Sequence, residues 1–317
     1  MIDYIQITKH LNSKDTLNFG YLQLEAEYAS GLQKFFVKGC RNMEFMYNQR
    51  LNYIILKGSP MYFIQGHNFT YDKGIFIEAI KYIEKLIGII LFDCIVDRLE
   101  YGAIMKVDIR PQRVITGHLA GNGLTMEERT KDKGNIRYFN DTNVSLKLYN
   151  AGINIQHKQG LKMKDIIQAA GWNPKNNFIK FEAHYKNPHL SLNNGKGLLL
   201  SDILLPSYEK ILKADLLKQY KRLEKMKSIV IPSTKKELFT SDIILLTLAE
   251  IALNQGIDIK KLIHSFIKSI PEEVLTAEDK KARRKKVKEL LEKVQSSIKS
   301  EFDITDNLTN VLYHKNI

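Results

Sequence analysis

The sequence predicts an α+β fold, with an antiparallel-sheet domain at residues 1–190 and a helical region at residues 191–317. Three observations predict it. Short apolar-polar alternations separated by glycines fill residues 1–60 and return between residues 94 and 185. One helical pattern interrupts them at residues 75–92, and beyond Gly195 the periodicity is helical. A chain of 317 residues is long enough for two domains of this kind.

The strands and the first helix follow from local patterns. Isoleucines recur at intervals of three and four from Ile77 to Ile90, which predicts a helix over residues 75–92 with Asp72 as its cap. The glycine-rich segment 111–143 predicts a short helix and a mobile loop. Strands are expected at Tyr4–Ile7, Tyr21–Glu25, Lys34–Lys38, Leu51–Leu56, 94–107, 135–139, 144–157 and 178–185.

The helical region contains two features that could contact DNA. An apolar run after Ser241 is followed by a turn at Gly256 and a second helix over 259–270, an arrangement typical of a helix-turn-helix but also of a plain packing hairpin. Seven of the nine residues from Lys280 to Lys288 are basic. They predict either a DNA-backbone contact or a solvated charged face. The candidate DNA contacts here are Arg283, Arg284, Lys285 and Lys286.

Composition favours a polyanionic partner. The net charge is +13 and the pI is about 9.4, and phosphate neutralisation by Lys and Arg releases condensed counterions. Two cysteines, Cys40 and Cys94, are too few for a disulfide framework or a cysteine-rich zinc site. The first residues lack the apolar core of a signal peptide, and the longest apolar run, Leu86–Phe92, is too short to span a bilayer. We therefore expect a cytoplasmic protein without a membrane partner.

Chemistry-bearing residues group by strand parity, because residues two apart on a strand share a face. The first group is Lys180, Glu182 and His184, and the second is Arg98 and Glu100. Lys147 and Tyr149 form the third. Each polar face could be ordinary wet sheet surface, but three strands with matching chemistry favour a shared site.

These residues predict a metal-assisted phosphodiester reaction. Imidazole and carboxylate ligands suit Mg²⁺ or Mn²⁺, and we expect His67, Glu100 and Glu182 to hold the ion. A tyrosine would attack the phosphate, and Lys147 would favour its phenolate. His184 is an alternative ligand or proton shuttle, or a structural residue.

The chain also resembles a known family over residues 1 to about 190. The anchors, in order, are Lys57-Gly-Ser-Pro60, Gln65-Gly-His-Asn68, Arg98-Leu-Glu100, Ser145-Leu-Lys-Leu-Tyr149 and Lys180-Phe-Glu-Ala183. With these segments the chain resembles the gene II/X replication initiators of filamentous phages and related rolling-circle replication proteins. The resemblance implies a nuclease-like fold of the HUH/Rep kind, with a divalent metal and a tyrosine that nicks and rejoins one DNA strand. It also implies single-stranded or supercoiled origin DNA, a host helicase and a host polymerase as partners.

Two tyrosines are candidates for the nucleophile. Tyr149 matches the tyrosine after the Leu-Lys-Leu strand and is the preferred one. Related plasmid initiators use a Thr-x-Tyr-x-Gly motif about a dozen residues upstream, and Tyr138 occupies that place without the threonine or the glycine. Family members carry Lys and Glu after the tyrosine, where this chain has Ala151 and Asn154. His157 or Lys158 could supply the missing charge.

The prediction is a site- and strand-specific, metal-dependent nicking and joining enzyme that initiates rolling-circle replication. Arg98, Lys180 and His184 are expected to contact DNA beside the reacting residues. One alternative is a DNA-binding replication protein without catalysis. The other is a relaxase that acts in DNA transfer, which the missing His-x-His motif disfavours.

Overall fold

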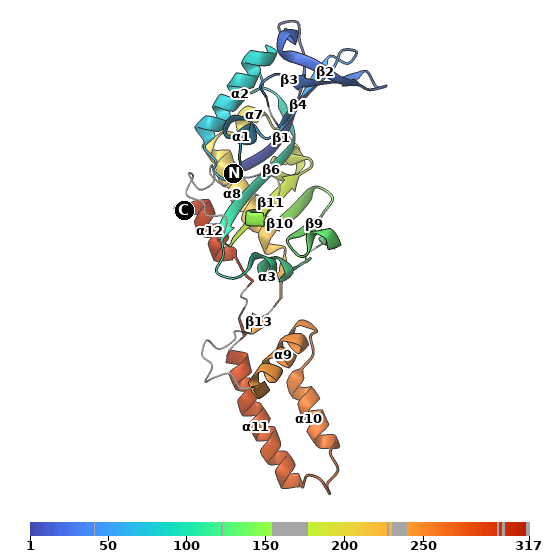
Figure 1. Ribbon diagram of the computed structural model, residues 1–317, viewed down its shortest axis with the longest axis vertical. Coiled ribbons are helices and arrows are strands. Elements are labelled where there is room, and N and C mark those ends of the chain that lie inside the picture. The colour runs from blue at the N-terminus through green and yellow to red at the C-terminus, as the bar shows by residue number, and fades with distance from the viewer. Residues whose placement is uncertain are drawn as a thin grey trace. The chain divides into compact units, whose positions relative to one another are not determined.

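The computed structural model shows a mixed α/β protein with a large antiparallel sheet (Figure 1). It describes residues 1–40, 42–121, 123–153, 177–226, 228–229, 240–296, 298–299 and 302–314. The chain forms two compact units. The first contains residues 1–116, 120–223 and 304–317, and the second contains residues 117–119 and 224–303.

The first unit is built on a ten-stranded sheet in the order β2-β3-β4-β5-β1-β6-β11-β10-β9-β8. Every neighbouring pair is antiparallel. The strands are β1 (Ile2–His10), β2 (Leu22–Glu27), β3 (Leu32–Val37), β4 (Met43–Asn48), β5 (Tyr53–Gly58), β6 (Ile95–Lys106), β8 (Thr125–Glu127), β9 (Ile136–Asn140), β10 (Val144–Asn150) and β11 (Phe178–Tyr185).

The two faces of this sheet differ. Alternate residues of β1, β9 and β10 are buried, and the residues between them are only half-buried. The buried face packs against helices α2 (Lys73–Ile87), α3 (Pro111–Thr116), α8 (Pro206–Lys221) and α12 (Thr305–Tyr313). Phe181 and Tyr220 meet edge to face in this core, with ring centroids 5.4 Å apart. The half-buried residues form the other face, which we call the polar face.

Helix α2 begins and ends at sequence signals. The Asp72 side chain accepts the backbone N–H of Ile75, as an N-cap does. Gly88, in the left-handed conformation, ends the helix after Ile87. A Cβ at Gly88 would also lie 2.6 Å from the carbonyl oxygen of Thr16. The predicted helix is therefore confirmed, but it ends five residues before the predicted end at residue 92.

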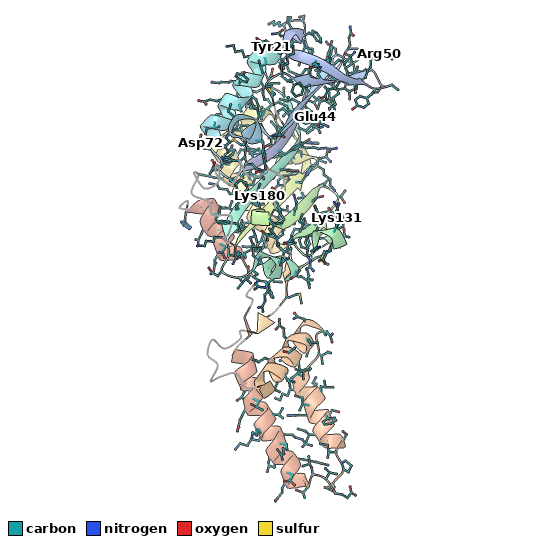
Figure 2. The ribbon with its side chains drawn as sticks, in the orientation of Figure 1. Tyr21, Glu44, Arg50, Asp72, Lys131 and Lys180 are labelled. Atoms are coloured by element: carbon teal, nitrogen blue, oxygen red, sulfur yellow. The ribbon has the colours of Figure 1, made fainter. Side chains whose placement is uncertain are left out.

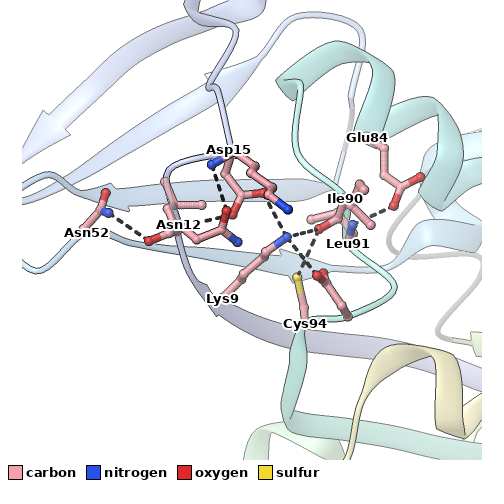
Figure 3. A network of polar contacts seen from close by, with 11 residues as sticks. Lys9, Asn12, Asp15, Asn52, Glu84, Ile90, Leu91 and Cys94 are labelled. Carbon is pink, nitrogen blue, oxygen red and sulfur yellow. Dashed lines mark hydrogen bonds and ion pairs between the residues drawn. The ribbon is translucent and has the colours of Figure 1, made fainter.

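A buried lysine fixes the end of β1 to two loops (Figure 3). Lys9 Nζ lies 3.0 Å from Asp15 and 3.0 Å from Asp93, and it donates to the carbonyl oxygen of Ile90 at 3.2 Å. Burial alone would lower the pKa of this ammonium, but the two carboxylates raise it above its ordinary value. These contacts hold the loop after β1 against the turn before β6.

The unit boundary lies beyond the predicted boundary at residue 190. Helix α8 belongs to the first unit because Leu212, Leu216 and Tyr220 are buried against its sheet. The last helix, α12, returns to the same unit, where Asn307 Nδ2 donates to the carbonyl oxygen of Lys106 at 3.0 Å. Sequence periodicity predicts where helices form, but it does not predict which structural unit each helix packs against.

The second unit is mainly helical and contains α9 (Thr240–Asn254), α10 (Ile259–Ser269) and α11 (Ala277–Ser296). Asp258 caps α10 by accepting the N–H of Lys261 at 3.0 Å. Helices α10 and α11 run in opposite directions beside one another (Figure 1). The short pairs β7 (His118–Leu119) with β12 (Glu224–Lys225) and β13 (Ser228–Ile229) with β14 (Ile298–Lys299) complete it.

Several elements of the first unit were not predicted, among them the short strand β8, which lies where a helix and a loop were expected. Strand β4 was missed, and so was helix α1 (Pro60–Gln65), whose first turn is capped by Ser59. Gly66 ends α1 in the left-handed conformation, so that His67 follows directly after a helix. Among the described helices, none combines the length and the apolar character that a membrane crossing requires.

Candidate functional site

The polar face carries the predicted site residues in cross-strand rows. One row runs Tyr4, Glu100, His184, Ser145 and Asn140 across β1, β6, β11, β10 and β9. The next row holds Gly102, Glu182, Lys147, Tyr138 and Glu127. The third holds Ile104, Lys180, Tyr149 and Ile136. Six strands (β1, β6, β11, β10, β9 and β8) therefore bring these side chains to one surface.

A buried charged cluster lies at the centre of this surface. Lys180, which is labelled in Figure 2, is 1% exposed. Its Nζ contacts Asp3 and lies 2.8 Å from Oε1 of Glu182. The hydroxyl of Tyr149 donates to the same Glu182 oxygen at 2.9 Å. Lys147 reaches the other oxygen at 3.6 Å from the more exposed side. We call Asp3, Tyr149, Lys180 and Glu182 the buried cluster.

The charges of this cluster set its protonation. Burial disfavours every ion in it, but Lys180 and Lys147 together hold the pKa of Glu182 well below its ordinary value. The carboxylates raise the pKa of Lys180 despite its burial. Burial, with repulsion from Glu182, raises the pKa of Asp3 to about 8. The opposite pKa shifts of the two carboxyl groups favour a proton on Asp3 and the anionic form of Glu182.

Gly102 makes room for the Glu182 side chain. A Cβ at position 102 would lie 2.7 Å from Cγ of Glu182 and 2.8 Å from the carbonyl oxygen of Phe181. Both distances are shorter than atoms tolerate, and the second one involves backbone, which cannot rotate away. Glycine opposite Glu182 therefore allows the carboxylate to lie flat on the sheet and to reach Lys180 and Tyr149.

The environment of Tyr149 opposes a nucleophilic role. Its side chain is buried, and burial together with the Glu182 and Asp3 carboxyl groups raises its pKa well above the ordinary value. Lys147 Nζ lies over its ring, 4.2 Å from the centroid, and not at the oxygen. A phenolate at Tyr149 would face a carboxylate 2.9 Å away. The expected activation of Tyr149 by Lys147 is therefore not what this geometry favours.

Tyr138 has the opposite surroundings. It is half-buried on β9, and Lys147 lies directly opposite on β10. The guanidinium carbon of Arg129 lies 4.6 Å from the centroid of its ring. Arg129 thus lies over the ring of a half-buried tyrosine, and its guanidinium also pairs at 2.7 Å with Glu127, the residue opposite Tyr138 on β8.

The expected metal ligands do not assemble. In the described part of the chain, no three His, Cys, Asp or Glu side chains lie close enough to share a metal ion. Nδ1 of His67 accepts the backbone N–H of Phe69 at 3.3 Å, which places the ring proton on Nε2. Burial lowers the pKa of this imidazole. Glu182 is occupied by Lys180 and Tyr149, so the trio of His67, Glu100 and Glu182 does not fit a metal centre.

Glu100 instead pairs with the second histidine. Nδ1 of His184 lies 2.9 Å from Oε1 of Glu100, and both side chains are about one-third exposed. The Tyr4 ring lies beside the imidazole, with centroids 6.4 Å apart. Burial and the Glu100 carboxylate raise the pKa of Tyr4. The pair is a carboxylate-held imidazole that solvent reaches.

The expected DNA-contacting residues fall into two groups. Arg98 is exposed on β6, and Arg283, Lys285 and Lys286 are exposed on α11, with Arg284 half-buried. These side chains can reach a phosphate backbone. Lys180 is enclosed in the buried cluster, so its expected DNA contact stays a prediction that this geometry does not favour. His157 and Lys158, the expected substitutes for the missing charge after Tyr149, lie outside the described residues, as does Asn154.

Sequence reasoning missed two members of this region. Asp3 lies in β1 at a register shift between Ile2 and Tyr4, which turns its side chain toward Lys180. Asn68 donates to the other Asp3 oxygen at 3.0 Å and so ties the loop after α1 to the cluster. Asp3 could have been noticed in the sequence because it is an acidic residue among the apolar residues that begin the first strand. Asn68 stood inside a predicted motif but was given no role.

The raised pKa of Asp3 predicts a pH-dependent stability. The folded state holds this proton up to about pH 8, whereas the unfolded chain releases it near its ordinary pKa of 3.8. The Asp3 contribution is therefore fully present below about pH 4 and is lost as the pH rises through about 8. We expect Asp3→Asn to flatten the pH dependence between pH 5 and 9 in urea unfolding. An unchanged slope relative to wild type would contradict the assignment.

Comparison of the chain with protein-family models, with curated proteins and with solved structures finds no match in any of the three.

Proposed function

We propose that the chain initiates rolling-circle replication by nicking and rejoining one strand of origin DNA, with Tyr138 as the nucleophile. The observation that carries this proposal is the polar face, where four strands gather Tyr138, Lys147, His184 and Glu100 around a solvent-accessible surface. A half-buried tyrosine that shares its face with basic side chains is suited to attack on a phosphodiester, whose charge those cations would balance.

The charge of the first unit supports a DNA partner. The second unit contains 16 Lys and Arg residues against 13 Asp and Glu, so it accounts for only three of the 13 excess positive charges. The sheet-bearing unit accounts for the other ten. Half-exposed tyrosines such as Tyr4 and Tyr138 offer stacking partners to the bases of a single strand. Arg98 and Lys147 would contact its phosphates.

The reaction follows from these positions. Tyr138 attacks the scissile phosphorus, its phenolic proton leaves to water, and the bond to the 3′-oxygen breaks. Lys147 and Arg129 balance the phosphate charge during the transfer. The strand with a free 3′-hydroxyl then primes a host polymerase while a host helicase unwinds the duplex. Rejoining reverses the transfer. A requirement for Mg²⁺ or Mn²⁺ stays a prediction, and none of these steps is assigned to a metal.

The test is a nicking assay on supercoiled plasmid that carries the DNA flanking the coding sequence. Wild type, with Mg²⁺ or Mn²⁺ present, should give open circles with protein bound covalently to the new 5′ end. Intact binding without nicking under either ion would contradict the proposal. Mapping the new ends would identify the strand and the nick site.

A second candidate function is DNA binding without catalysis. The missing ligand trio and the closed buried cluster favour it, because both leave the predicted metal centre unformed among the described residues. A pure binder should retard origin DNA equally well with and without EDTA, and it should never form a covalent adduct. A covalent adduct would exclude this candidate.

A further inference from the structure

We propose that a cavity beside β6 binds an uncharged nucleobase, carried by a nucleoside or by an unpaired nucleotide of a strand. The cavity has a volume of about 910 Å³, and every described residue that lines it belongs to the first unit. That size falls within the range of small-molecule sites, which enclose about 300 to 1,000 Å³. The inference goes beyond the proposed function, because binding in this cavity does not require nicking.

The cavity lies along a free edge of β6. Strand β1 pairs with β6 as far as Ile2, which lies opposite Tyr101. From there β6 continues to Lys106 with β11 as its only neighbour among the described strands. Helix α12 covers part of this edge, where Asn307 donates to the carbonyl oxygen of Lys106 (Figure 1). The first turn of α2 and one side of α8 complete the lining.

The free edge offers a backbone donor and a backbone acceptor. The N–H of Gly102 donates to the carbonyl oxygen of Met1, so the backbone groups of Gly102 face the β1 side. Every second residue of an antiparallel strand directs its N–H and C=O to the same side. Those of Ile104 therefore face the cavity, which Ile104 lines, and neither has a partner on that side among the described residues. A donor beside an acceptor complements the edge of a nucleobase, which presents the same two groups.

Tyr101 adds a buried polar group and an aromatic wall. It is 4% exposed and lines the cavity, and its hydroxyl has no hydrogen-bond partner among the described residues. A buried hydroxyl without a partner costs free energy, which an acceptor on a ligand would recover. Burial, together with the Glu209 carboxylate, raises the pKa of Tyr101, so the hydroxyl remains a donor at neutral pH. The rings of Tyr71 and Tyr101 offer apolar surface to a flat base.

The charges around the cavity favour an uncharged ligand. Lys213 Nζ lies 2.8 Å from the Glu209 carboxylate, so these two charges neutralise one another. Asp72 and Lys73 form a second pair of opposite charges at the start of α2, and the Asp72 carboxylate already accepts the N–H of Ile75. A phosphate at this helix start would meet a carboxylate and no excess of positive charge. A heterocycle with its own donors and acceptors fits this lining better than an anion does.

A fluorescent base analogue tests the site by equilibrium titration of the full chain. The first probe is the deoxynucleoside of 2-aminopurine, and we expect wild type to change its fluorescence in a saturable way. Tyr101→Phe should weaken binding by about 3- to 10-fold, because it removes one hydrogen-bond donor. Val311→Trp should abolish binding, because it fills the cavity from the half-buried side of α12. The second probe is an oligonucleotide with one 2-aminopurine. Tighter binding of the oligonucleotide would identify a DNA strand as the source of the base, and weaker binding would identify a free nucleoside.

Tyr208→Phe is the matched control. Tyr208 is also buried and its hydroxyl also has no partner among the described residues, but it does not line the cavity. This variant should keep wild-type affinity, and circular dichroism should show that each variant is folded. Wild type that binds neither probe would overturn the inference, as would unchanged affinity in folded Tyr101→Phe or folded Val311→Trp. Because the titration involves no cleavage, a failed nicking assay would reject the proposed function without changing this result.

Discussion

Tyr138→Phe should abolish both nicking and the covalent protein–DNA adduct, whereas Tyr149→Phe should keep both. Removing the nucleophile leaves no oxygen to attack phosphorus, so we expect a loss of at least about 1000-fold. Tyr149 is buried, its hydroxyl donates a hydrogen bond to Glu182, and the pKa of its phenol is raised. Substitution of Tyr149 by Phe therefore removes a structural hydrogen bond. That loss costs about 1 to 3 kcal/mol of stability because it leaves one carboxylate site unsatisfied.

The measurement is plasmid nicking together with detection of the adduct by denaturing gel electrophoresis. Tyr4→Phe is the matched control, because Tyr4 is also half-buried on the polar face but lies beyond His184 from Tyr138. Loss of the adduct in Tyr149→Phe alone would reverse the assignment and return the nucleophile to the Leu-Lys-Leu-Tyr strand. Loss in neither variant would point to a different nucleophile.

The sequence predicted the strands and the long helix well because both depend on local periodicity. The strand parity of Glu182 with His184 and of Lys147 with Tyr149 follows from the same two-residue repeat, and the observed registers place these residues in neighbouring rows. Register between strands is not encoded locally. The two-residue repeat could therefore place Glu182 and Tyr149 on the polar faces of their strands. It could not show that the Tyr149 hydroxyl donates a hydrogen bond to Glu182.

Burial was the second property that local pattern could not provide. Lys180 resembles an ordinary surface lysine in the sequence, and only the loop after α1 and the shifted start of β1 enclose it. The same enclosure separates Tyr149 from Tyr138, which parity cannot distinguish. Glu182 likewise had the residue type of a metal ligand, but a neighbouring lysine and tyrosine already satisfy its oxygens. Residue types in the sequence thus indicated the kind of chemistry. Which of these side chains are free to take part in it depends on their neighbours in the folded structure.

Lys180→Met should destabilise the first unit more than any other single change on the polar face. The substitution keeps the volume of the side chain but leaves Glu182 buried without its closest cation. Breaking a buried ion pair from one side costs about 3 to 5 kcal/mol. Lys147 is a more distant cation for the same carboxylate, at 3.6 Å, and its side chain is 30% exposed. Lys147→Met should therefore lower the free energy of unfolding by less than about 1 kcal/mol.

Urea unfolding of the first unit, followed by circular dichroism, measures both variants, and a second substitution identifies the cause. Glu182→Gln in the Lys180→Met background removes the unpaired charge, so the double variant should recover part of the lost stability. If the double variant is no more stable than Lys180→Met, packing and not charge would account for the loss. If Lys180→Met unfolds at the same urea concentration as wild type, Lys180 would not be the counter-ion that holds this face together. The recovery is therefore the critical result, because only an electrostatic origin predicts that a second mutation at a buried site restores stability.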